Sequence, residues 1–261
     1  MITGKKIVIT GASSGIGKAI LTKLVEGEGN KIIAAARKVD KLYDFGSKVI
    51  PFSCDLSGQA GVDALFNKIA EEFGKADIFF CNAGAPYYEQ YDYEDWDRVR
   101  RIFELNTISH MYIYSKYLHQ LDGAEGRLVY TVSAMGEMAT PGFALYASSK
   151  FAMKGFQEAI RYECPKNMKI TCVYPVSTNT NFFSVATDGG QMGKPFPVQS
   201  PEEVAEAVVK GVEEGKKQIY PCAIFRPSKA LMTLLPPVKT AYMAVEKSKL
   251  KKYLKNKKDK K

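Results

Sequence analysis

The chain has 261 residues, 46% of them hydrophobic, and a formal net charge of +9 at pH 7. This length suits one sizeable α/β domain and is short for two. Nine lysines and one aspartate lie in residues 247–261, so the rest of the chain is nearly neutral. Because no stripe of basic and aromatic residues interrupts this neutral part, we expect no nucleic-acid partner.

The cysteines and histidines indicate neither a disulfide framework nor a metal site. The five cysteines are odd in number and scattered, as expected of buried thiols in a reducing, cytoplasmic compartment. With two histidines and no Cys-x-x-Cys, no metal is predicted. No run reaches the roughly 18 apolar residues of a membrane span, and no secretory signal is expected before the first strand.

Short β-branched runs alternate with longer segments of helical period along the chain. This alternation predicts a Rossmann-like, doubly wound parallel sheet of about seven strands with helices on both faces. Ser200 and Glu203 predict a capping box at one helix start. The predicted strands are residues 5–10, 31–36, 48–53, 77–81, 126–132, 168–174 and 218–220, and the predicted helices 16–27, 38–45, 59–73, 93–119, 144–164 and 201–214.

We expect residues 1–225 to form a single dinucleotide-binding and catalytic domain, and residues 226–261 a C-terminal extension that is apolar and then lysine-rich. An apolar segment beside clustered lysines is typical of a helix in a membrane interface, so this extension could contact an anionic membrane peripherally. The alternative is that residues 228–245 cover the substrate pocket or a partner subunit, while the lysines form only a solvated end.

A glycine-rich turn lies between the first predicted strand and the first predicted helix. Backbone N–H groups and the positive end of a helix dipole make such a turn an anion site, and the expected ligand is the pyrophosphate of a dinucleotide. The spacing is Gly-x3-Gly-x-Gly, unlike the commoner Gly-x-Gly-x-x-Gly. The candidate contacts are Gly11, Ser13, Ser14, Gly15, Ile16 and Gly17.

The second predicted strand ends at Ala36, followed by Arg37 and Lys38, about 20 residues after the glycines. An acidic residue at this point would bind the ribose 2′-hydroxyl of NAD(H), and none is present. Because Ala36 leaves room and the guanidinium of Arg37 suits a phosphate, NADP(H) is favoured over NAD(H). In the alternative interpretation, Arg37 and Lys38 are solvated charges at a helix start.

Tyr146 and Lys150 stand four residues apart, on one face of a predicted helix. The same spacing occurs at Tyr112 and Tyr253, but only Tyr146 has a serine that ends a strand, Ser133, thirteen residues before it. Hydride transfer to a carbonyl needs a proton donor, a second donor for the oxygen and a cation that makes the first donor acidic. Tyr146, Ser133 and Lys150 fit these three roles in that order.

Together the glycine turn, Asn82-Ala83-Gly84, Asn106, Ser133, and Tyr146 with Lys150 resemble the short-chain dehydrogenase/reductase family over about residues 5–215. The resemblance implies that Asn106 completes a catalytic tetrad, by kinking a long helix and holding a water that leads to the lysine. It also implies a homodimer or tetramer formed through helices 93–119 and 144–164.

The resemblance further implies where the cofactor lies. Asp55 and Leu56 would hold the adenine, and Asn82, Ala83 and Gly84 would let the backbone approach the cofactor. Two departures from the family are Cys81, which replaces an asparagine, and Val176, which replaces a glycine. The residues implied beside the nicotinamide are Tyr146, Lys150, Pro175, Val176, Thr178 and Thr180.

The expected function is that of an NADP(H)-dependent oxidoreductase interconverting a carbonyl and a secondary alcohol. Residues 181–185 and 192–197, with Met135, Met138 and Phe143, would give a mobile, apolar wall for a hydrophobic substrate. Three alternatives remain: the same reaction with NAD(H), a catalytically silent nucleotide-binding sensor, and a membrane-docked interaction protein.

Overall fold

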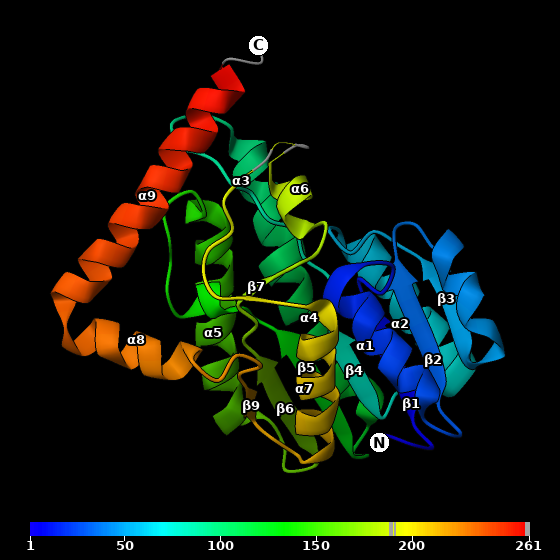
Figure 1. Ribbon diagram of the computed structural model, residues 1–261. Coiled ribbons are helices and arrows are strands. Elements are labelled where there is room, and N and C mark those ends of the chain that lie inside the picture. Colours follow the sequence, from blue (N-terminus) through cyan, green and yellow to red (C-terminus); the bar gives the residue numbers. More distant parts are fainter. Residues whose placement is uncertain (188–189, 191, 259–261) are drawn as a thin grey trace.

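The computed structural model describes residues 1–187, 190 and 192–258. These residues form a parallel sheet of seven strands in the order β3-β2-β1-β4-β5-β6-β9, which confirms the predicted fold (Figure 1). The order reverses between β1 and β4, where α/β sheets of this kind bind ligands. The strands are β1 (Lys6–Thr10), β2 (Lys31–Ala36), β3 (Val49–Ser53), β4 (Ile78–Cys81), β5 (Gly126–Thr131), β6 (Met168–Val173) and β9 (Gln218–Ile219).

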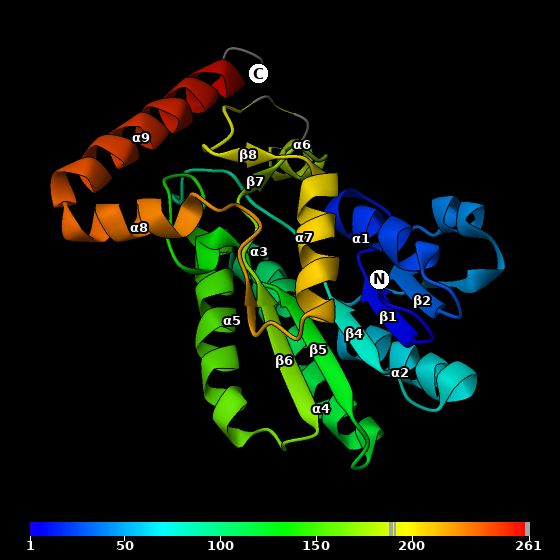
Figure 2. The same ribbon diagram turned by 60° about the horizontal axis from the view of Figure 1, so that its bottom comes forward.

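Helices cover both faces of the sheet because successive strand residues point to opposite sides. In β1, Ile7 and Ile9 pack under α1 and α7, whereas Val8 faces α2, α4 and α5. Figure 2 shows these two layers with the sheet between them. The helices are α1 (Gly15–Glu26), α2 (Gln59–Phe73), α4 (Ser109–Leu121), α5 (Ala144–Glu163) and α7 (Pro201–Glu213). The capping box of α7 is present as predicted, with Ser200 and Glu203 bonded to each other's backbone N–H.

Two predicted helices differ in the structure. Residues 38–45 do not form an α-helix: a 3₁₀ segment spans Asp40–Lys48 and is broken at Gly46, whose φ is +70°. The predicted helix 93–119 begins only at Trp96, because the side chain of Asp95 caps α3 (Trp96–Phe103) by accepting from the Arg98 N–H. A π-helical turn, Glu104–Ile108, then separates α3 from α4.

Two further segments lie outside the sheet and its two helical layers. Between β6 and α7 the chain forms α6 (Phe182–Ala186) and a small sheet of β7 (Ser177–Thr178) with β8 (Val198–Gln199), which the sequence did not indicate. After β9 come α8 (Phe225–Leu234) and α9 (Pro236–Lys258), which make a V at the side of the molecule (Figure 1). Within the described residues, none of the helices combines the length and apolar character needed to cross a bilayer.

Candidate active site

The glycine turn is pressed against the end of β4. A Cβ at Gly17 would lie 2.2 Å from the Gly11 carbonyl oxygen and 2.5 Å from Nδ2 of Asn82, so only glycine fits there. The Thr10 hydroxyl accepts hydrogen bonds from the backbone N–H groups of Asn82 and Ala83, both at 3.0 Å. Gly11, Ser13, Ser14, Gly15 and Ile16 line a cavity at the N-terminus of α1, where free backbone N–H groups and the helix dipole suit a pyrophosphate.

A cavity of about 810 Å³ opens at this end of the sheet. All of the site residues predicted from the sequence line it except two, Gly17 and Asn106. Gly17 lies in the first turn of α1 and packs against Gly11 and Asn82, and Asn106 is fully buried in the π-helical turn. Among the described residues, no cluster of His, Cys, Asp and Glu could hold a metal ion.

At the end expected to receive the adenosine, Arg37 and Lys38 are exposed at the cavity edge, beside the small side chain of Ala36. The Asp55 carboxylate accepts from the Ser57 N–H at 3.0 Å and from the Ser57 hydroxyl at 2.8 Å. These bonds and the nearby Arg37 guanidinium lower the pKa of Asp55. Cys81 is fully buried at the end of β4, and burial raises the pKa of its thiol.

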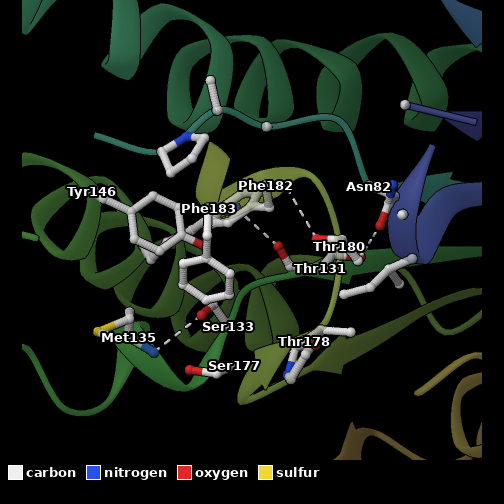
Figure 3. A pocket seen from close by; sticks show the side chains of 18 of the residues that line it. Asn82, Thr131, Ser133, Met135, Tyr146, Ser177, Thr178, Thr180, Phe182 and Phe183 are labelled. Atoms are coloured by element: carbon white, nitrogen blue, oxygen red, sulfur yellow. Dashed lines mark hydrogen bonds between the residues drawn. The ribbon is translucent and has the colours of Figure 1, made fainter. Parts of the chain in front are cut away.

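Tyr146 and Ser133 face the same space in the cavity (Figure 3). Burial raises the pKa of Tyr146 to about 12. A hydrogen bond with the Ser133 side chain has the opposite, smaller effect and lowers this pKa. Ser133 has a φ of +99°, an unusual value for a residue with a Cβ, and its Oγ accepts from the Met135 N–H at 3.2 Å. Strained backbone of this kind costs about 1–3 kcal/mol and is found most often at functional sites.

Lys150 lies one helical turn after Tyr146 on α5, with its Nζ 5.8 Å from the centroid of the Tyr146 ring. Its ammonium group donates to the Thr131 carbonyl oxygen at 3.0 Å, and burial lowers its pKa to about 8. A Cβ at Gly84 would lie 3.6 Å from this Nζ and 3.2 Å from Oδ1 of Asn106. Gly84 therefore lets the loop after β4 pass close to both side chains.

Asn106 ties three elements together. Its side chain exchanges two 2.9 Å hydrogen bonds with the main chain of Ala85 and donates to the Ser149 hydroxyl at 3.0 Å. Its own carbonyl oxygen accepts from Nδ1 of His110 at 3.0 Å, one turn further along. The long helix thus changes to π-helical geometry at Asn106, the residue at which the family resemblance implies a kink.

His110 is a buried member of this region that the sequence did not single out. Because Nδ1 donates to a carbonyl oxygen, Nε2 carries the lone pair, and it has no hydrogen-bond partner among the described residues. Burial and the Lys150 ammonium lower the pKa of His110 to about 3, against a smaller opposite effect of the Asn106 and Ala83 main chain. A lone histidine on a helix gave no signal of this contact.

Residues of α6, the loop before β8, α8 and α9 line much of the rest of the cavity. Phe182 and Phe183 of α6 and Phe196 lie on one side, with Phe225 and Met232 of α8 on another. Tyr242 of α9 also lines the cavity. The structure therefore places part of residues 228–245 at the pocket, as the second of the two interpretations of this segment expected.

The chain was compared with known proteins. A family model described as "short chain dehydrogenase" matches residues 5–189. Estradiol 17-beta-dehydrogenase 11 of Rattus norvegicus is 31% identical over 252 residues, covering 91% of this chain and 80% of that protein. Glycine betaine reductase ATRR of Emericella nidulans is 30% identical over 227 residues, 82% of this chain, which spans only 18% of that longer protein.

Among solved structures, an alcohol dehydrogenase from Thermococcus sibiricus, complexed with 5-hydroxy-NADP, aligns with a TM-score of 0.72 and 26% identity. The alignment covers 83% of this chain and 95% of that one. The family match covers well over half of the chain and contains the glycine turn, Ser133, Tyr146 and Lys150. The chain belongs to the short-chain dehydrogenase/reductase family of oxidoreductases.

Proposed function

We propose that this protein is an NADP(H)-dependent reductase or dehydrogenase that interconverts a carbonyl and a secondary alcohol. The observation that carries the proposal is the convergence of Tyr146, Ser133 and Lys150 in the same cavity as the glycine turn. The cofactor, when bound, supplies or accepts the hydride. In reduction Tyr146 gives its phenolic proton to the substrate oxygen, and Ser133 donates a hydrogen bond to that oxygen. The Lys150 ammonium group stabilises the tyrosinate that results.

The cofactor preference is proposed from the end of β2. Arg37 stands at the cavity edge where a 2′-phosphate would lie, Ala36 leaves space, and no acidic residue follows the strand. The Thermococcus sibiricus enzyme is complexed with 5-hydroxy-NADP and a Burkholderia phymatum enzyme of the same fold with NAD, so the choice between the two cofactors rests on Arg37. Contacts proposed for the cofactor are those predicted from the sequence, with Gly17 acting by close packing.

We propose a hydrophobic substrate, since aromatic and methionine side chains of α6 and α8 line the cavity. For partners we propose a second copy of the chain, making a homodimer or tetramer through α4 and α5, where Phe151 is 43% exposed. We place the protein in the cytoplasm, with residues 1–225 as the catalytic domain and the C-terminal extension in peripheral contact with an anionic membrane.

Cofactor oxidation with a panel of hydrophobic ketones tests this function. Tyr146→Phe keeps the ring and removes the proton donor, so turnover should fall by on the order of 10² or more while NADPH still binds. Tyr112→Phe is the matched control, because Tyr112 and Lys116 have the same spacing but Tyr112 bonds Asp63 outside the cavity. Full turnover in Tyr146→Phe would refute the assignment, and NADPH binding without turnover of any ketone would favour the silent sensor.

A further inference from the structure

The corner between α8 and α9 exposes apolar side chains outside the cavity. Leu231, Leu234, Leu235 and Val238 are 49%, 78%, 49% and 37% exposed, and we name Leu231 and residues 233–238 the elbow. Every residue from 233 to 241 is exposed, two adjacent prolines included. Scattered apolar residues need no explanation, but a contiguous exposed group of this kind marks an interaction surface.

The charge around the elbow indicates what kind of surface it fits. Residues 225–258 contain ten basic residues and one acidic residue, Glu246, which is buried and paired with Lys249 at 2.7 Å. Lys247, Lys251 and Lys255 are exposed at intervals of four along α9, a like-charge spacing that destabilises a helix unless anions neutralise it. A second copy of the chain would bring the same positive charge to this face, whereas anionic lipid would complement it.

Another face of α8 belongs to the cavity. Phe225, Ser228 and Met232, which share one face of α8, line the main cavity. Met232 and Lys229 also line a second cavity, of about 260 Å³, that reaches Lys239 just beyond the elbow. Lys229 pairs with Glu137 at 2.6 Å and so holds α8 to the loop that follows Ser133. The same helix thus carries exposed residues of the elbow and residues that line the cavity.

We propose that the elbow inserts into the interface of an anionic phospholipid bilayer and that the cavity beneath α8 takes its hydrophobic carbonyl or alcohol substrate from that bilayer. The substrate part of this inference rests on the proposed function. The outward lysines of α9 bind the headgroups while the elbow leucines reach the acyl boundary, as in a helix lying in a membrane interface.

The inner face of α9 fixes the pocket wall in this orientation. The Tyr242 hydroxyl donates to the Phe196 carbonyl oxygen at 3.3 Å, and the Lys249 ammonium donates to the Lys194 carbonyl oxygen at 2.9 Å. Tyr253 packs on Tyr88 with ring centroids 5.1 Å apart. The same helix that would bind lipid therefore holds residues 194–196, of which Pro195 and Phe196 line the cavity.

Vesicle co-sedimentation tests the docking. The full chain should pellet with phosphatidylcholine vesicles containing 30% phosphatidylglycerol and poorly with pure phosphatidylcholine, and salt should weaken the binding. The double variant Leu234→Glu/Leu235→Glu should reduce the bound fraction at least about tenfold, since apolar burial is lost and the anionic surface repels the two added carboxylates. Tyr162→Glu is the matched control: Tyr162 is 93% exposed but lies on α5, away from the elbow.

Two results would overturn docking on lipid. One is equal pelleting of the elbow variant and the wild type. The other is a change in oligomeric state of the elbow variant by light scattering without vesicles, which would make the elbow an interface between copies. Circular dichroism of each variant verifies that it is folded.

The substrate source is tested with the same variants and two ketones. Turnover of a water-soluble ketone should be unchanged in the elbow variant, whereas turnover of a long-chain ketone embedded in the anionic vesicles should fall at least fivefold. Equal turnover of the embedded ketone would refute delivery from the bilayer. Absence of turnover with both ketones in the wild type would instead refute the proposed function and leave the vesicle-binding result standing.

Discussion

Lys150 is buried beside Thr131, and that burial lowers its pKa to about 8. Below this pH the ammonium group can stabilise a tyrosinate at Tyr146, and above it the neutral amine cannot. We therefore expect ketone reduction to fall as pH rises through about 8, measured as the pH profile of kcat/KM. Arginine stays charged at all accessible pH values, so Lys150→Arg should lose this falling limb even if its turnover is lower. If kcat/KM of Lys150→Arg fell over the same pH range as in the wild type, a group other than Lys150 would cause the fall.

His110 is held neutral in the fold by burial, with a pKa of about 3 against 6.5 for an ordinary histidine. The unfolded chain binds a proton below pH 6.5 that the native state does not bind, so stability falls as the pH drops toward 3. The expected loss between pH 7 and pH 5 is about 2 kcal/mol from this residue.

Urea unfolding of His110→Asn at both pH values measures this loss. The Asn amide can replace the Nδ1 donor to the Asn106 carbonyl oxygen without titrating. The pH dependence between 7 and 5 should therefore be about 2 kcal/mol weaker in His110→Asn than in the wild type. An unchanged slope would mean that other groups cause the acid sensitivity.

At the scale of elements, the end of β2 tests cofactor choice. Ala36→Asp places a carboxylate at the cavity edge beside Arg37, where it would repel a 2′-phosphate and bind a ribose hydroxyl. The ratio of kcat/KM for NADPH to that for NADH should drop at least about tenfold, or 1.4 kcal/mol. Tyr43→Asp, which adds the same charge at a residue that is 66% exposed and does not line the cavity, should leave the ratio unchanged. If the wild type preferred NADH, the inference that Arg37 binds a 2′-phosphate would be wrong.

The strands and most helices could be predicted because their apolar periods are local properties of the sequence. The seven strands fall within a residue or two of the predicted bounds, since buried parallel strands are short, continuous apolar runs between helices. The π-helical turn at Glu104–Ile108 could not be predicted from periodicity. It is accompanied by contacts of Asn106 with Ala85 and Ser149, which lie 21 and 43 residues away.

In the candidate site, too, some residues could be predicted from local motifs and others depend on tertiary packing. Motif spacing was enough to bring nearly all predicted residues to one cavity, because parallel strands end at one edge of the sheet. His110 and Tyr88 gave no signal, since their roles depend on packing against distant elements. The pocket wall from α8 was only one of two interpretations, because an apolar segment suits a pocket or a membrane equally well.

At the scale of the whole molecule, α9 serves two surfaces with two sets of residues. Its inner residues include Tyr253, which is 4% exposed and packs on Tyr88, itself in contact with Phe143 at a ring-centroid distance of 4.9 Å. Phe143 lies 6.1 Å from the Tyr146 ring, so a row of aromatic rings joins α9 to the site. Deletion of residues 247–261 would remove both Tyr253, at the outer end of this row, and the lysines. It therefore could not distinguish the effect of the inner face of α9 from that of its lysine-bearing face.

Point substitutions do separate them. Tyr253→Ala removes the outer ring of this row and frees Tyr88 and Phe143 to shift beside Tyr146, so KM for a water-soluble ketone should rise by roughly tenfold, or 1.4 kcal/mol. Vesicle binding should change little, because the exposed lysines and the elbow remain. Lys251→Gln/Lys255→Gln should do the reverse, weakening vesicle binding and leaving KM unchanged. If both variants changed both measurements together, α9 would act as one unit, and the division between its inner and outer faces would be wrong.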